Sequence, residues 1–168
     1  MKKSRISKNQ TYIFVLIALI FIAFFAYNYF TVPHYHAEFL VYKDGEKLDL
    51  NGIEHMYFAP CRVYEFGERE LEEIDRAHLH DSVGDVVHLH DDGVTWRVLL
   101  SNLNIEGEFF GYNKEGQLIE GLLDRVVIPY ESVIFSNKEL ENIDELVGEL
   151  KGADYVREVE VVAVECAG

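Results

Sequence analysis

Hydrophobic and polar residues divide the chain into one long apolar stretch and a following region of short elements. Residues Thr11–Phe30 form an uncharged run. As a helix rising about 1.5 Å per residue, this run is roughly 30 Å long, enough to cross the hydrocarbon core of a membrane. It ends in bulky aromatic residues, which favours an uncleaved anchor over a cleaved signal peptide or a buried core helix. We therefore expect a transmembrane signal-anchor at residues 11–31.

The charges on the two sides of this stretch differ in sign. Four basic and no acidic residues precede Pro33, whereas all 30 acidic residues follow it. Positively charged flanks stay on the cytoplasmic side of a membrane. This asymmetry predicts a single-pass protein of the cell membrane, with a cytoplasmic basic tail at residues 1–10 and an extracytoplasmic domain at residues 34–168.

The pattern after Pro33 is typical of a mixed α+β domain made of β-hairpins and two short helices. Residues 36–50 alternate around Asp44-Gly45, which is a signal for a two-residue hairpin turn. In this register one face of the hairpin is apolar, and the other carries His34, His36, Glu38 and Leu40. Residues 78–90 predict a second hairpin, and Thr95 can cap a short helix that ends near Leu103.

The second half of the domain predicts scaffold elements. Residues 109–119 and 125–135 read as strands separated by turn residues. Ser136 and Glu139 form a capping box for an amphipathic helix that ends before Gly152. Residues 155–164 alternate and predict a last strand.

Composition limits the classes of function. The chain has 168 residues, 49% of them hydrophobic, and a formal net charge of −15. The apolar content predicts a folded protein rather than a disordered one. The negative charge argues against nucleic acid as a partner, because phosphate binding needs a basic surface.

Histidines carry the candidate chemistry. Six of the seven form three His-x-His pairs, and His55 stands apart. Side chains two positions apart on a strand share a face. Two registers of the second hairpin are open, one that places His78 opposite His90 and one that places it opposite His88. Both registers put four imidazoles on one face. If the two hairpins share a sheet, one mixed metal site or two adjacent metal sites result. The predicted metal ligands are His78, His80, His88, His90, His34 and His36.

Acidic residues next to these pairs are expected to orient the imidazole rings or to ligate the metal directly. The candidates are Glu38, Asp81 and Asp91. Imidazole ligands suit Zn(II) or Cu(II), whereas Cu(I) prefers sulfur, and the chain has only two methionines.

Cys61 and Cys166 are the only cysteines. In an exported domain they are candidates for a disulfide. Two unpaired thiols, or Cys61 as a metal ligand, are the alternatives.

These observations predict a membrane-anchored extracytoplasmic metal-binding protein that stores, relays or senses Zn or Cu(II). One alternative is a metal-dependent enzyme at the same histidines, either a zinc hydrolase or a copper or iron oxidoreductase, in which an open coordination position activates water or oxygen. The other is a metal-free interaction module of the cell envelope.

Overall fold

The computed structural model of the chain describes residues 8–30, 34–57 and 73–162, and within the first helix it describes the side chains of residues 12–23. The chain divides into two compact units, Met1–Val32 and Pro33–Gly168.

The first unit contains helix α1 (Lys8–Phe30). In the described part of the chain, no helix is long and apolar enough to cross a membrane. This finding contradicts the predicted transmembrane signal-anchor at residues 11–31, and with it the predicted single-pass location in the cell membrane.

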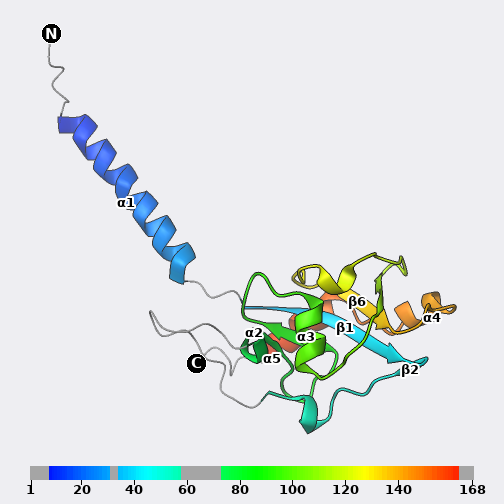
Figure 1. The fold of residues 1–168 in the computed structure, drawn as a ribbon. Helices are drawn as coiled ribbons and strands as arrows, with labels where there is room; N and C mark the ends of the chain where they lie inside the picture. Colours follow the sequence, from blue (N-terminus) through cyan, green and yellow to red (C-terminus); the bar gives the residue numbers. More distant parts are fainter. Residues whose placement is uncertain (1–7, 31–33, 58–72, 163–168) are drawn as a thin grey trace. The chain divides into compact units, whose positions relative to one another are not determined.

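Over residues 34–57 and 73–162, the second unit is a mixed α+β domain around a six-stranded sheet. Its strands run in the order β3 (Ala77–His78), β4 (Val86–Leu89), β1 (Tyr35–Lys43), β6 (Ser132–Ser136) and β5 (Phe110–Asn113), and β2 (Glu46–Lys47) pairs with the end of β1. Strand β1 is antiparallel to β4 and parallel to β6 (Figure 1). Both predicted hairpins therefore contribute to one sheet.

The turn after β1 has the predicted geometry. Asp44 and Gly45 both have positive φ angles, 58° and 90°, and the flanking pair is Lys43 and Glu46. A two-residue turn with positive φ at both positions matches the right-handed twist of the strands. The second hairpin takes the register in which His78 lies opposite His88.

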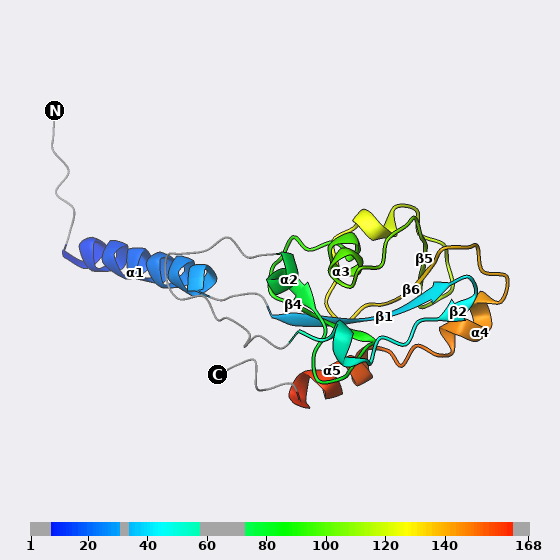
Figure 2. The ribbon, with the colours of Figure 1, turned by 60° about the horizontal axis from the view of Figure 1, so that its bottom comes forward.

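Helices cover both faces of the sheet, as Figure 2 shows. On one face, α3 (Trp96–Asn102) packs Trp96 and Leu99 over the apolar side of β1, including the fully buried Phe39. Thr95 occupies the N-cap position of α3, as expected, but its side chain makes no capping hydrogen bond. On the other face, α4 (Ile143–Val147) packs Leu146 against Leu40 and Tyr42. The main hydrophobic core thus lies on the side of β1 that carries no histidine.

The helices of this domain differ from the prediction in number and extent. Besides α3 and α4, the described residues contain α2 (Glu73–Arg76), α5 (Ala153–Val162) and two 3-10 turns at Ile53–His55 and Leu122–Asp124. The helix expected from Ser136 onward is limited to α4, since Ser136 ends β6 and residues 137–142 belong to neither element. The prediction of a strand at residues 155–164 is wrong for residues 155–162, which belong to α5. Helix α5 lies against β1 on the same side of the sheet as α4 (Figure 2).

Candidate metal centre

The register of three adjacent strands places three histidines in one row. His36 of β1 lies opposite His88 of β4, and His88 lies opposite His78 of β3. Residues directly opposite each other in a sheet project from the same face. These side chains are almost fully buried, with relative exposures of 0% for His36, 1% for His88 and 2% for His78.

The other three predicted ligands flank this row. His34 precedes β1, His80 follows β3 and His90 follows β4, each two positions from a histidine of the row. The six rings form a closed circuit of neighbours. Its centroid separations are 4.8 Å for His34–His36, 4.1 Å for His36–His88, 4.5 Å for His88–His80, 4.7 Å for His80–His78, 5.1 Å for His78–His90 and 4.9 Å for His90–His34. The structure therefore brings together all six histidines that alternation singled out.

Three of the six form a group that could hold a metal ion. His34, His36 and His88 each offer a ring nitrogen, and these nitrogens all lie within 4.8 Å of one another. Within the group, His36 Nε2 lies 3.0 Å from His88 Nδ1. His34 is exposed whereas His36 and His88 are buried. An ion could therefore enter from the side of His34 and be held against the two buried rings.

A carboxylate from α5 reaches the other side of the His36 ring. Glu160 Oε1 lies 3.7 Å from His36 Nδ1, and Tyr130 donates a hydrogen bond of 2.8 Å to Glu160 Oε2. Metal-bound histidines commonly donate their second ring N–H to a carboxylate, which fixes the tautomer and the ring orientation. Sequence patterning missed Glu160 and Tyr130, because both come from the half of the chain interpreted as scaffold.

His78 and His80 form a second close pair. His78 Nδ1 donates a hydrogen bond of 2.8 Å to the carbonyl oxygen of Ile74, so the proton of the neutral ring is at Nδ1. The His78 Nε2 lone pair then faces His80 Nε2 at 2.9 Å. The backbone of α2 thus orients a ring nitrogen that can accept a proton or a metal ion.

Burial keeps the rings neutral. It lowers the pKa of His36 and His90 to about 4 and that of His78 to about 3, and it lowers the pKa of His88 still further. Repulsion from neighbouring imidazolium rings adds to this effect, because two cations at such distances disfavour each other. The pKa values of His34 and His80 are lowered by burial as well. At neutral pH the cluster therefore presents unprotonated nitrogens, the form that a metal ion requires.

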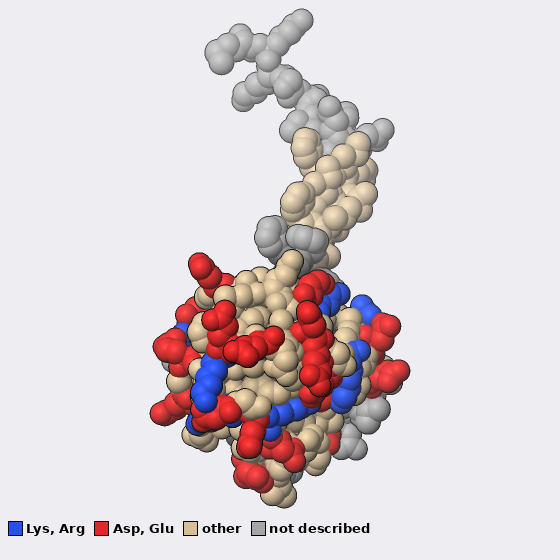
Figure 3. Space-filling view, turned by 90° about the vertical axis from the view of Figure 1, so that its right-hand side faces the viewer, with Lys and Arg blue, Asp and Glu red and all other residues tan. Residues whose placement is uncertain are grey.

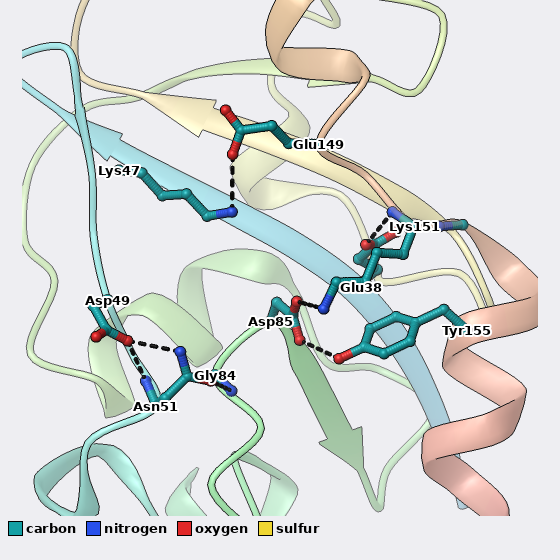
Figure 4. Close-up of polar contacts among 10 residues, drawn as sticks. Glu38, Lys47, Asp49, Asn51, Gly84, Asp85, Glu149, Lys151 and Tyr155 are labelled. Carbon is teal, nitrogen blue, oxygen red and sulfur yellow. Dashed lines mark hydrogen bonds and ion pairs between the residues drawn. The ribbon is translucent and has the colours of Figure 1, made fainter.

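The structure assigns different roles to two of the three predicted acidic residues. Glu38 is buried, and its two oxygens accept hydrogen bonds from the backbone N–H groups of Lys151 and Gly152 at 2.7 and 2.8 Å (Figure 4). The Asp91 carboxylate pairs with Arg76 at 2.8 Å. Glu38 therefore holds the start of α5, and Asp91 faces a cation rather than a ring. Asp81 is exposed, and its charge acts on His80.

His55, the seventh histidine, is not part of the circuit of six rings. His55 lies beside Glu54, 3.9 Å away, in the 3-10 turn. Cys61 and Cys166 lie outside the described residues, and no pair of cysteines able to form a disulfide occurs within them. The predicted disulfide, and the alternative of Cys61 as a metal ligand, therefore have no structural support.

Comparison of the chain with models of protein families, with curated proteins and with solved structures finds no match.

Proposed function

We propose that the domain binds a divalent transition-metal ion, Zn(II) or Cu(II), through His34, His36 and His88, and that it stores, relays or senses this ion. The observation that carries the proposal is the convergence of three neutral imidazole nitrogens within 4.8 Å. Two of them come from paired strands, whose register aligns His36 with His88. The sheet therefore fixes two of the three ligands by backbone pairing alone.

The spacing of the two buried nitrogens suits such an ion. Zinc binds histidine nitrogen at about 2.0–2.1 Å, so two ligands of a tetrahedral site lie about 3.3 Å apart. His36 Nε2 and His88 Nδ1 are 3.0 Å apart. Small adjustments of these two rings, together with an inward rotation of His34, complete three coordination positions and leave the fourth for water or a further ligand.

The donor set favours Zn(II) or Cu(II) over other ions. Imidazole suits both metals, whereas Cu(I) prefers sulfur and calcium prefers oxygen ligands. Met56 packs with the main hydrophobic core, on the opposite side of the sheet. Acidic side chains predominate on the face of the domain shown in Figure 3. Such a surface raises the local concentration of cations without selecting among them.

Metal content and thermal stability test the proposal. We expect the purified chain to retain zinc or copper after desalting, and we expect EDTA to lower its Tm, because an ion that binds only the folded state stabilises it. His36→Ala should abolish retention of the ion at this site, and His55→Ala should leave it unchanged. A chain that holds no metal by elemental analysis and shows no thermal shift with added Zn(II) or Cu(II) contradicts the proposal.

Glu160 offers a second test, which leaves the ligands intact. Glu160→Gln removes the charge that faces His36 Nδ1 and should weaken metal affinity by about 10–100-fold, the usual cost of losing such a partner. Glu158→Gln is the matched control, because Glu158 is exposed on the same helix. Isothermal titration calorimetry with Zn(II) measures the metal affinity of both variants. Equal affinities for the two variants would show that Glu160 does not orient the ring.

A further inference from the structure

We infer that the cluster holds a second metal ion beside the first, bound by His78, His80 and His90. This inference extends the proposed function and rests on it. It starts from the closed circuit of six rings, which contains two close pairs of ring nitrogens rather than one. His36 and His88 form the first pair, and His78 and His80 form the second.

The second pair brings two ring nitrogens within reach of one ion. Its nitrogens lie 2.9 Å apart, close to the spacing in the first pair. The hydrogen bond from His78 Nδ1 to Ile74 leaves His78 Nε2 free of a proton. His80 offers its Nε2 to the same ion once its proton moves to Nδ1, a change of tautomer with no change in charge.

His90 supplies the third ligand. Its Nε2 is buried and has no hydrogen-bond partner. A buried polar atom without a partner is costly and calls for an explanation, such as an ion. The His90 ring stacks on His78 with an interplanar angle of 22° and a centroid separation of 5.1 Å. Among the described residues only His34, His36 and His88 form a ready group of ligands, so a second ion needs a rotation of the His90 ring towards the pair.

Each group of three histidines has its own acidic neighbours. The charge of Glu160 acts on His34 and His36, whereas Asp75 acts on His78 and His90, and Asp81 acts on His80. Two divalent ions in one cluster repel each other, and a carboxylate beside each ion offsets that repulsion. The two groups of histidines therefore have different acidic neighbours.

His88 connects the two groups. Its ring centroid lies 4.1 Å from that of His36 and 4.5 Å from that of His80. An ion released by one group therefore meets the other without leaving the cluster. This arrangement suits a relay, in which the ion moves from the exposed His34 towards the buried His78.

Metal titration of the full chain tests the inference. After removal of metal with a chelator, Zn(II) titration followed by desalting and elemental analysis should give two ions per chain. The paired variant His78→Ala/His80→Ala should retain one ion, and His34→Ala/His36→Ala should also retain one. Circular dichroism of the metal-free variants checks that each one is folded.

A measurement on the unmodified chain keeps the inference testable if a variant does not fold. Two Cu(II) ions in neighbouring sites should broaden each other's electron paramagnetic resonance signal as the ratio rises from one to two per chain. If the chain binds a single ion that is lost in His34→Ala/His36→Ala but kept in His78→Ala/His80→Ala, the second site is overturned and the first site stands. A single ion lost in both variants means one shared site and also overturns it. No bound ion at all overturns the proposed function as well.

Discussion

The metal-free domain should lose stability as the pH falls below about 6.5. In the unfolded chain a histidine takes up a proton near pH 6.5, whereas burial lowers the pKa of folded His36 to about 4 and that of His78 to about 3. The unfolded state therefore binds more protons throughout this window, and the free energy of unfolding decreases with falling pH. A shift of one pKa unit corresponds to about 1.4 kcal/mol, so each of these two residues lowers the free energy of unfolding by about 2 kcal/mol at pH 5. When the contributions of His88 and His90 are included, the decrease in the free energy of unfolding is a large share of the stability of an ordinary domain.

Urea unfolding of the metal-free protein between pH 7.5 and 4.5 measures this effect. The midpoint should fall steeply below pH 6.5, and Zn(II) should delay the fall, because a bound ion competes with protons for the same nitrogens. His55→Ala is the control, since His55 lies apart from the cluster and its loss should leave the profile unchanged. A midpoint that stays constant from pH 7.5 to 5 would contradict the burial of neutral rings.

Alternation and turn chemistry predicted the first hairpin correctly, because both are local. Asp44-Gly45 specifies its own turn, and one apolar face of β1 specifies which side meets α3. The parallel pairing of β1 with β6 joins residues almost a hundred positions apart. No local pattern encodes a contact at that separation, so the strand order had to come from the structure.

Helix α5 shows how a short pattern misleads. The apolar residues of 155–162 alternate well enough to resemble a strand. Burial instead follows helical spacing, since Val156 is fully buried, Tyr155, Val159 and Glu160 are half-buried, and Arg157 and Glu158 are exposed. Glycine at position 152, with a φ of 84°, and the two hydrogen bonds to Glu38 favour a helix start here. Those hydrogen bonds are tertiary and override the local preference.

The proximity of the paired histidines was predictable from the sequence, but their grouping was not. Alternation alone placed the paired histidines on one face. The grouping of His34 and His36 with His88 depends on the pairing of β1 with β4, which the sequence left open. Glu160 reaches the cluster only because residues 153–162 are helical, so the misassigned element also concealed the carboxylate that faces His36.

Replacement of Glu38 should destabilise the fold and weaken metal binding together. Glu38 lies two positions after His36 on the same face of β1, and its carboxylate accepts both N–H groups that precede α5 (Figure 4). Hydrogen bonds to a charged group contribute about 1.5–3 kcal/mol each, so Glu38→Ala should cost about 3 kcal/mol in the free energy of unfolding. Without this connection α5 is held less firmly, and Glu160 no longer keeps its place beside the His36 ring.

Two measurements separate these effects. Urea unfolding of the metal-free Glu38→Ala variant gives the loss of stability, and Zn(II) titration under conditions where the variant is folded gives the loss of affinity. Glu149→Ala is the matched control, because Glu149 has an exposed ion pair with Lys47 just before α5, and such pairs contribute little. If Glu38→Ala and Glu149→Ala prove equally stable, the carboxylate does not anchor the helix. If Glu38→Ala is destabilised but binds zinc as tightly as the unmodified chain, α5 serves the fold alone, and the orientation of His36 depends only on the sheet.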